Sequence, residues 1–351
     1  MPWKRLFGVA FAISIAVAGQ PSVQAATREV LTGGGCGGSA SWSLHLVPAN
    51  GRIAVTFALT TAEAGQDWSV RIKHGTTLAW SGTKATDGRG DFSMTLDRWD
   101  RPGTDTFVGR ARNLATNQVC RGTAALEPVY TFRDEFNGTA LGSSWRSWAT
   151  SGDLTYSSTQ RGVGLGRLTI SAIRSASGWT SAGVDTCYGR FAQLYGYFEA
   201  RVRFSSGYGV WPAFWLTQGY SVGQRNELDI MESLANPVWG TRPDTSARYY
   251  ATVHYDDGLG GPAQQFGGWP YTSKLDLAGT WHIYSMYWRP NRVSFYIDGM
   301  RWKTFTDSAH IPSVPMCVIF DLAMGGSWPG PTTASTPSPS TFEVDWVRVS
   351  N

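Results

Sequence analysis

The stretch ELDIME, residues 227–232, places three carboxylates within six residues and sets them among apolar side chains. Apolar and acidic residues alternate over its first half, which is typical of a β-strand that buries one face. Because side chains two positions apart in a strand share a face, Glu227 and Asp229 point the same way. The stretch therefore predicts a sheet with one acidic surface and one apolar surface.

The third acid of the stretch, Glu232, breaks the alternation. Strict alternation would turn Glu232 to the face opposite Asp229. One extra residue in a β-bulge, either Ile230 or Met231, would return it to the first face. We therefore expect all three acids on one surface, with Leu228 and at least one of the two candidate bulge residues in the core.

Three interpretations of this acidic strand differ in their chemistry. An exposed strand with an acidic outer face is the simplest, but it does not explain why the acids lie between apolar residues. A metal site made of carboxylates is the second, and the lack of a histidine nearby in the sequence argues against zinc or iron. The third is a carboxylate pair for glycoside hydrolysis, in which one acid attacks the sugar and another gives and takes a proton. We favour the third because of the aromatic residues that precede the strand.

The segment VWPAFW, residues 210–215, is predicted to form the strand next to the acids. Trp211, Ala213 and Trp215 share one face by the two-residue period. A link of about ten residues to the acidic strand favours antiparallel pairing. Pro212 removes one ladder hydrogen bond and predicts an edge or a distortion. Rings beside acids suit pyranose binding, because the apolar face of a sugar stacks on them; for each tryptophan alone, core packing is the alternative.

Composition indicates an all-β chain. Of the 351 residues, 42% are hydrophobic and 16% are charged, and glycine and tryptophan number 41 and 17. Such a composition favours strands, turns and aromatic surfaces over helices. From Tyr130 onward, strand-like runs follow one another without helical patterns, which predicts an antiparallel two-sheet sandwich. The runs are GRLTISAI, LYGYFEARVRF, VWPAFWLT, ELDIME, YYATVHY, HIYSMYW, RVSFYIDG, MCVIFDLAM and FEVDWVRVS.

Residues 1–25 have the features of a signal peptide. Lys4 and Arg5 precede an apolar stretch, Leu6 to Ala18, that is too short to span a bilayer comfortably. Small residues before Ala26 offer a cleavage site. We therefore expect an exported, soluble protein with no membrane partner after cleavage. The net charge of +4 is mild and no basic run occurs, so nucleic acid is not an expected partner.

Residues 26–126 are predicted to form a small all-β accessory module ahead of a catalytic region at 127–351. Short alternating runs separated by Gly, Asp and Asn have the spacing of a β-sandwich. No cluster of acids or histidines suggests chemistry here. The module either stabilises the chain or binds carbohydrate through tryptophans, although tryptophans in small sandwiches usually pack in the core. The candidates are Trp42, Trp68, Trp80 and Trp99.

Four cysteines remain after cleavage, and an even number in an exported chain favours disulfides. Four cysteines allow three pairings. The domain organisation favours a bridge between Cys36 and Cys120, near the two ends of the module. Cys187 and Cys317 would then pair, or stay buried and free.

The motif Glu227-x-Asp229-x-x-Glu232 resembles the active-site signature of glycoside hydrolase family 16, in the bulged form of its laminarinase branch. Lichenases and xyloglucan enzymes of that family have one residue fewer in this motif. Further segments are similar to the family's sequences, and the resemblance covers about residues 130–351. These segments are DEFNGT (134–139), YGYFEARVRFSSGYGVWPAFW (195–215), LAMGGSWPG (322–330) and VDWVRV (344–349).

The resemblance implies a β-jelly roll whose concave sheet forms the substrate cleft. Glu227 matches the nucleophile, Glu232 the general acid/base, and Asp229 the acid that holds the nucleophile and its proton. His254 resembles a histidine on the leaving-group side, with a core or sheet-edge histidine as the alternative. Aromatic residues near the sugar subsites are matched by Trp211, Trp215 and Trp328.

Asp345 matches a carboxylate that holds a structural calcium ion in many family members, with an exposed aspartate as the alternative. Calcium prefers oxygen ligands and tolerates irregular geometry, so one carboxylate with backbone carbonyls would serve. Catalysis is expected to need no cofactor. One departure concerns Asp321, where the family often has Asn; an added charge near the cleft would alter substrate preference or pH behaviour.

We therefore expect a secreted, monomeric, retaining endo-β-glycosidase that acts on a β-linked polysaccharide, with β-1,3-glucan as the first choice. Within the family, β-galactan, agar-type polymers and mixed-linkage glucan remain open as substrates. From a different class, a non-catalytic glycan-binding jelly roll is the alternative, and the three intact acids argue against it.

Overall fold

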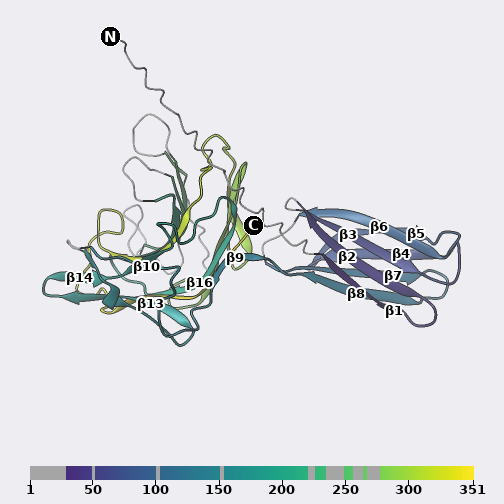
Figure 1. The fold of residues 1–351 in the computed structure, drawn as a ribbon, viewed down its shortest axis with the longest axis horizontal. Helices are drawn as coiled ribbons and strands as arrows, with labels where there is room; N and C mark the ends of the chain where they lie inside the picture. Colours follow the sequence, from purple (N-terminus) through teal and green to yellow (C-terminus); the bar gives the residue numbers. More distant parts are fainter. Residues whose placement is uncertain are drawn as a thin grey trace, which may run out of the picture. The chain divides into compact units, whose positions relative to one another are not determined.

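The computed structural model of the chain describes residues 29–49, 52–99, 103–150, 154–219, 226–234, 249–255, 264–266 and 277–351. The chain forms two compact units, Met1–Leu126 and Glu127–Asn351, whose strands are drawn in Figure 1. Among the described residues, the 3₁₀ helix η1 (Ser158–Gln160) is the one helical element, and no helix is long and apolar enough to cross a membrane. The all-β prediction is confirmed. The predicted signal peptide, residues 1–25, lies outside the described residues.

The first unit is a sandwich of two four-stranded sheets. One sheet has the order β1-β2-β3-β6, with β1 (Val30–Gly35), β2 (Ser41–Ala49), β3 (Arg52–Thr60) and β6 (Asp91–Trp99). The other has the order β5-β4-β7-β8, with β4 (Asp67–His74), β5 (Thr77–Ala85), β7 (Asp105–Asn113) and β8 (Val119–Leu126). Buried and exposed residues alternate along strands such as β8, so each sheet turns one face to the core.

Two of the candidate tryptophans of the module take structural roles. Trp68 is fully buried in the core, together with Phe57 and Phe107. The ring of Trp42 lies so close to Gly122 that a Cβ on this glycine would be 1.9 Å from it. Only glycine fits beneath that ring, since any side chain would displace it.

The other two candidate tryptophans lie nearer the surface of the module. Trp80 is partly buried against the core, and Trp99 is 53% exposed with the guanidinium of Arg52 at 4.3 Å from its ring centroid. The predicted disulfide between Cys36 and Cys120 is present. It links the segment after β1 to β8 and so joins the two sheets covalently, which restricts the unfolded chain.

The second unit is a larger sandwich, and one of its sheets has seven strands in the order β10-β15-β24-β17-β18-β19-β20. The strands are β10 (Arg146–Ser147), β15 (Gly183–Asp185), β24 (Cys317–Met324), β17 (Val210–Thr217), β18 (Glu227–Glu232), β19 (Tyr250–Tyr255) and β20 (Gln264–Phe266). The acidic strand β18 is interior, with β17 antiparallel on one side, as predicted, and β19 on the other.

The opposing sheet follows the path β11-β14-β13-β25-β16-β21-β22-β23, with β12 added beside β13 and β9 beside β25. Its pairs are antiparallel, except that β11 runs parallel to β14. The strands are β9 (Tyr130–Asp134), β11 (Leu154–Tyr156), β12 (Arg161–Gly164), β13 (Arg167–Ser175), β14 (Gly178–Ser181), β16 (Gly196–Phe204), β21 (His282–Arg289), β22 (Arg292–Ile297), β23 (Met300–Phe305) and β25 (Ser340–Ser350).

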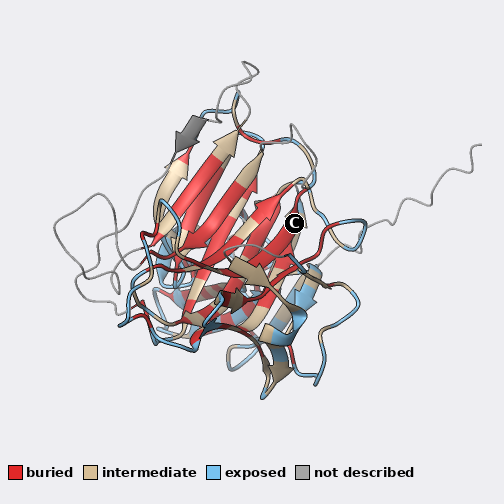
Figure 2. Ribbon diagram, turned by 90° about the vertical axis from the view of Figure 1, so that its left-hand side faces the viewer, coloured by how far each residue is buried: buried red, intermediate tan, exposed pale blue. Residues whose placement is uncertain are grey.

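The core of the second unit lies between these two sheets, and Figure 2 shows buried residues along most of the strands that face the viewer. An aromatic chain crosses it: Phe214 of β17 stacks on Phe320 of β24, which packs against Phe342 of the opposing β25. Full burial of each such side chain contributes about 1.5–3 kcal/mol. This core fixes the inner face of β17 and β24, and therefore their outer face as well.

Pro212 does not mark an edge strand, because β17 lies between β24 and β18. The carbonyl oxygen of Pro212 accepts from the backbone of Ser233, so its nitrogen faces the same side, toward β18. Pairing with β18 ends at Ala213, the next residue. Proline has no N–H to return a second bond to Ser233, so the ladder with β18 stops there, as the sequence predicted.

Candidate active site

The acidic strand β18 contains the predicted bulge. In its pairing with β17, Asp229 and Met231 lie opposite consecutive residues, so Ile230 has no partner. The pairing with β19 is shifted over the same residues. The extra residue returns Glu232 to the side of Asp229. Leu228, Ile230 and Met231 are all buried in the core, at 1% exposure or less.

Directly paired residues of neighbouring strands project from the same face of a sheet, so the register shows what accompanies each acid. Read from β24 to β19, the rows are Cys317, Thr217, Glu227 and His254; then Ile319, Trp215, Asp229 and Thr252; then Asp321, Ala213, Glu232 and Tyr250. We call this surface, defined by these three rows, the acidic face. It gathers a fourth carboxylate, Asp321, and His254 beside the three predicted acids.

Glu232 is a buried acid on this face, with 7% exposure. Its Oε1 accepts a hydrogen bond from Nε1 of Trp211 over 2.9 Å. Burial, helped by the charge of Asp229, raises the pKa of Glu232 well above its ordinary value, and the bond from Trp211 opposes this shift. Glu232 therefore keeps its proton to a higher pH than an exposed glutamate does.

Asp229 and Glu227 form a coupled pair with one buried and one accessible member. Asp229 is 2% exposed, and burial together with the charge of Glu227 raises its pKa well above the ordinary value. The side chain of Glu227 is 37% exposed, and burial raises its pKa while His254 lowers it. A hydrogen bond between the two carboxyl groups lowers the pKa of Glu227 and raises that of Asp229. The shared proton therefore resides on Asp229 and is donated to Glu227.

His254 lies close to both Asp229 and Glu227. Its Nε2 lies 2.9 Å from Oδ2 of Asp229 and 3.7 Å from Oε1 of Glu227. Oδ2 of Asp229 is buried and has no hydrogen-bond partner in the described part of the chain, so the short contact lacks the direction of a hydrogen bond. Burial lowers the pKa of His254, which favours the neutral ring.

The position of His254 corrects the argument that no histidine accompanies the acids. Ligand atoms of Glu227, Asp229 and His254 lie within 4.8 Å of one another, close enough to hold a metal ion. A metal ligand must be deprotonated, however, and Asp229 is the acid that retains its proton most firmly in this pair. Metal binding at this group would have to displace the proton of Asp229.

An aromatic group lies beside Glu232. The rings of Trp211 and Trp328 meet edge to face with centroids 5.3 Å apart, and Tyr250 meets Trp328 in the same way at 5.1 Å. The structure thus brings the predicted Trp211 and Trp328 together and adds Tyr250. Edge-to-face contacts hold each ring in one orientation.

A second aromatic group surrounds Asp321. Nε1 of Trp215 donates to Oδ1 of Asp321 over 2.8 Å, and the hydroxyl of Tyr156 donates to Oδ2 over 3.2 Å. Trp148 lies edge to face against both rings. Burial raises the pKa of Asp321 to about 6, although both donors oppose the shift. The predicted Trp215 is therefore held in place by the acid that departs from the family pattern.

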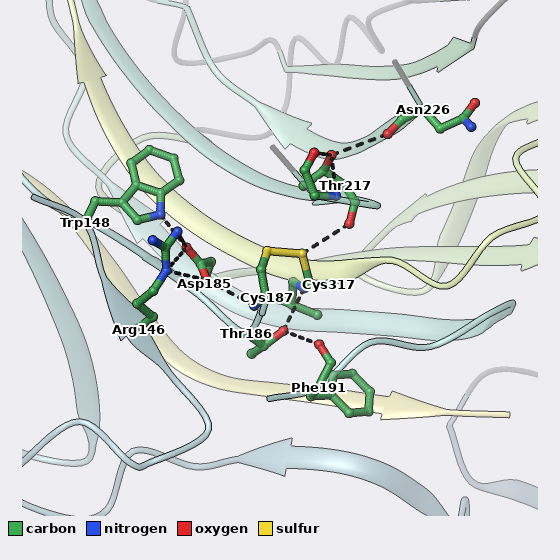
Figure 3. The surroundings of a disulfide bond; sticks show 11 residues. Arg146, Trp148, Asp185, Thr186, Cys187, Phe191, Thr217, Asn226 and Cys317 are labelled. Carbon is green, nitrogen blue, oxygen red and sulfur yellow. Dashed lines mark hydrogen bonds and ion pairs between the residues drawn. A yellow bond between two sulfur atoms is a disulfide. The ribbon is translucent and has the colours of Figure 1, made fainter. Parts of the chain in front are cut away.

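A disulfide between Cys187 and Cys317 packs against Trp148 and Trp215 of this second group, and Figure 3 shows the surroundings of the disulfide. Asp185 is fully buried and accepts from Nη2 of Arg146 over 2.5 Å and from Nε1 of Trp148 over 2.6 Å. Its other oxygen accepts from the backbone of Cys187 over 3.0 Å. Cys187 is bonded to Cys317, so of the two outcomes left open for these cysteines the structure has the bridge.

The family of the chain follows from a comparison with protein-family models. The model of glycosyl hydrolases family 16 matches residues 145–348, which are 204 of the 351 residues and include the whole acidic face. The chain belongs to glycosyl hydrolases family 16. The resemblance that the acidic motif suggested is confirmed.

Two curated relatives and one solved structure illustrate the family 16 match. Endo-1,3-1,4-beta-glycanase EglC of Rhizobium meliloti (strain 1021) is 29% identical over 299 residues, which cover 82% of this chain and 60% of that protein. Beta-glucanase of Rhodothermus marinus is 32% identical over 192 residues, which cover 49% of this chain and 62% of that protein. The chain thus spans less than two thirds of either relative. The catalytic domain of an endo-1,3-beta-glucanase (laminarinase) from Thermotoga petrophila RKU-1 shares the fold of the second unit, which is the predicted β-jelly roll. The TM-score is 0.55 at 24% identity, and the match covers 64% of this chain and 98% of that domain.

The family 16 calcium position carries an ion pair in this chain. Asp345 of β25 accepts from Nη1 of Arg201 over 2.6 Å, and the two side chains are 30% and 38% exposed. The guanidinium of Arg201 thus forms an ion pair with the carboxylate that the resemblance assigns to calcium. No group of potential metal ligands among the described residues includes Asp345. The assignment of a calcium ion to Asp345 stays a prediction.

Sequence reasoning missed several residues of this family 16 site. Tyr250 could have been predicted from the sequence, because Tyr250 lies four positions before His254 in one strand and must share the face of His254. Trp148 and Asp185 come from short strands and loops that carry no periodic pattern. Their proximity to the acids depends on pairing between strands far apart in the sequence, which no local signal reports.

Proposed function

We propose that this family 16 chain is a retaining endo-β-glucanase with β-1,3-glucan as its first substrate. The observation that carries the proposal is the contrast between two acids of one face. Glu232 is buried and keeps its proton, whereas Glu227 is more exposed and accepts a hydrogen bond from the protonated Asp229. Carboxyl groups whose environments push their pKa values apart suit an acid and a nucleophile. The names of the relatives, a 1,3-1,4-β-glycanase and a β-glucanase, support the substrate class.

In the first step, a carboxylate oxygen of Glu227 attacks the anomeric carbon of a bound sugar. A bond forms between that oxygen and the carbon, and the bond from the carbon to the leaving oxygen breaks. Glu232 transfers its proton to the leaving oxygen, which departs as a hydroxyl. Burial of Glu232 supports this role, because the proton is retained until the leaving oxygen becomes basic.

In the second step, Glu232 is ionised and takes a proton from water. The water oxygen attacks the same anomeric carbon, and the bond to Glu227 breaks, which regenerates both acids. Asp229 assists in both steps by donating its hydrogen bond to Glu227, which keeps the nucleophile ionised and oriented. Two inversions at one carbon give net retention.

The aromatic groups on either side of the acids support cleavage within a chain. Trp328 and its partners lie beside Glu232, and Trp215 and its partners surround Asp321. Each group offers ring faces or edges to a pyranose, so consecutive sugars of one polymer have separate places to bind. A polymer held at two places is cleaved between them, which is endo action.

We also propose that the chain works outside the cell as a monomer. Both pairs of cysteines form disulfides, which persist in oxidising compartments. The N-terminal residues 1–25 have the charge and apolar pattern of an export signal.

The test is a screen of purified protein against laminarin, lichenan, agarose and β-galactan, with release of reducing ends as the measurement. We expect the highest rate on laminarin, and Glu227→Gln and Glu232→Gln should each lower it by roughly a hundredfold or more. Melting temperatures of both variants should not fall below that of the wild type. Near wild-type turnover in either variant would exclude its assigned role. Binding of laminarin without release of reducing ends would instead indicate a glycan-binding protein.

A further inference from the structure

A row of three arginines crosses the outer face of one sheet in the first unit. Arg71 of β4 lies opposite Arg110 of β7, and Arg110 lies opposite Arg121 of β8. Directly opposite residues of neighbouring strands have Cβ atoms about 4.5–5.5 Å apart. The three guanidinium groups therefore leave the sheet next to one another.

Two more cations widen this row into a patch. Lys73 follows Arg71 by two positions on β4, so both point the same way, and Ile72 between them is fully buried. Arg112 follows Arg110 by two positions on β7 in the same manner. We call these five side chains the basic face: Arg71, Lys73, Arg110, Arg112 and Arg121.

In the part of the chain that the structure describes, no acid forms an ion pair with the basic face. Within the described ranges, none of its five cations forms an ion pair; Arg112 donates to Oδ1 of Asn117 over 2.9 Å. The outward-facing acid of these strands, Asp67, lies at the end of the sheet opposite Ala85. Like charges directly opposite each other destabilise a sheet. Folding therefore gains nothing from this row, and an external anion is the partner that would balance it.

In the other sheet of the same unit, basic side chains form ion pairs. Arg52 forms an ion pair with Asp97 of the neighbouring strand, and His45 contacts Glu29. The unneutralised cations are thus concentrated on one side of the sandwich. An overall surplus of basic residues does not explain this asymmetry, since the chain as a whole carries a net charge of only +4.

We propose that the basic face binds an acidic polysaccharide, a sugar polymer that carries carboxylate or sulfate groups. A flat array of cations from three strands matches negative charges that repeat along an extended chain, and guanidinium groups bind carboxylate and sulfate oxygens with paired N–H donors. Hydroxyl groups on the same face are available for sugar hydroxyls. They belong to Ser69, Ser81, Thr83, Thr106 and Thr123.

A polysaccharide fits this face better than nucleic acid or a membrane. The outward positions of its strands carry no aromatic side chain on which a base could stack. Among the described residues of this unit, no helix is present to enter a groove. An amphipathic helix, the usual membrane-surface element, is also absent from the described part of this unit. The linked second unit belongs to a family of glycosyl hydrolases, so holding a sugar polymer raises its effective concentration there. The proposal rests on that family membership and not on the linkage that is cleaved.

The experiment uses the full chain and isothermal titration calorimetry at low salt against three polymers: alginate for carboxylate, dextran sulfate for sulfate, and neutral laminarin. We expect binding of alginate or dextran sulfate that weakens as salt rises, because exposed charges are screened. The triple variant Arg71→Thr, Arg110→Thr and Arg121→Thr should bind about tenfold more weakly or worse. The matching Arg→Lys variant should retain binding, which separates loss of charge from loss of fold. Laminarin titrations should not change.

A matched control removes the same charge from exposed arginines elsewhere: Arg89→Thr, Arg133→Thr and Arg301→Thr. This control should bind the acidic polymers like the wild type. The proposal is overturned if the wild type binds neither acidic polymer, if the Arg71, Arg110 and Arg121 variant binds as well as the wild type, or if the control loses as much. Tighter binding to a single-stranded oligonucleotide or to phosphatidylserine vesicles, lost in the same variant, would assign the face to another partner class and also overturn it. Failure to cleave laminarin would count against the proposed function alone, because binding is measured independently.

Discussion

Trp211 donates a hydrogen bond from Nε1 to Oε1 of Glu232 over 2.9 Å. This bond lowers the pKa of Glu232 against the larger opposing effect of burial. Trp211→Phe removes the donor, so the pKa of Glu232 should rise. Since the first step needs Glu232 protonated, the alkaline limb of the pH profile of kcat/KM should move to higher pH.

The same substitution should lower kcat by about tenfold, because a more basic Glu232 gives up its proton less readily. Trp328→Phe is the matched control, since it removes an indole from the same aromatic group without removing a hydrogen bond to Glu232. Its pH profile should keep the wild-type limb. An unmoved limb in the Trp211 variant would show that the bond does not tune the acid.

Asp321→Asn should move the acid limb of the profile. Asp321 has a pKa of about 6, and its charge above that pH raises the pKa of Glu227. Asparagine keeps an oxygen for Nε1 of Trp215 but carries no charge, so the pKa of Glu227 should fall and the acid limb should move to lower pH. The measurement is kcat/KM on laminarin between pH 4 and pH 8.

The stability of the Asp321 variant should also depend on pH. The folded-state pKa of Asp321 is raised from 3.8 to about 6, so the stability of the fold decreases as pH rises between these two values, and the loss is complete above about 6. Asp321→Asn should therefore melt at a higher temperature than the wild type at pH 7.5 and at nearly the same temperature at pH 4. A constant difference at both pH values would contradict the buried charge as its cause.

Retention of configuration is the stereochemical prediction. Glu227 lies two positions before Asp229, and Glu232 lies two positions after it when the unpaired bulge residue is left out, so all three share one face. Carboxyl groups about 5–5.5 Å apart favour a covalent intermediate. Proton NMR of the early reaction should show the β anomer first, and added alcohols should receive sugar. An α anomer appearing first would mean inversion and would remove the role of Glu227.

Chelation should leave the protein intact. Arg201 holds the carboxylate of Asp345 that a calcium ion would need. We expect EDTA to change neither the melting temperature nor the activity. Arg201→Leu, which leaves Asp345 without its partner, should create sensitivity to added calcium in the melting temperature. A drop in wild-type melting temperature with EDTA, restored by calcium chloride, would show that the ion displaces Arg201.

The sequence alone was sufficient for features that a short segment determines. The period of two, with one extra residue, placed Glu227, Asp229 and Glu232 on one face before any neighbour was known. The cysteines at the two ends of the module identified the bridge between Cys36 and Cys120. In each case the deciding distance is set by local geometry or by the bounds of one unit.

Features that depend on lateral register were beyond the sequence. Asp321 lies in the row of Glu232 because both residues pair with Ala213, and His254 lies opposite Glu227 although 27 positions separate them in the sequence. No periodicity reports which residues of separate strands will lie opposite each other. The ion pair between Arg201 and Asp345 was hidden for the same reason, because the two residues are 144 positions apart.

The bulge at Ile230 makes the acidic strand tolerant of one particular deletion. Removing Ile230 would leave acids at alternate positions of an unbroken strand, with Leu228 and Met231 still turned to the core. Losing Leu228 instead would turn Glu227 to the opposite face. A gene encoding this strand therefore lies a single codon away from the shorter motif of the lichenases and xyloglucan enzymes, and that codon can be lost without reversing any acid.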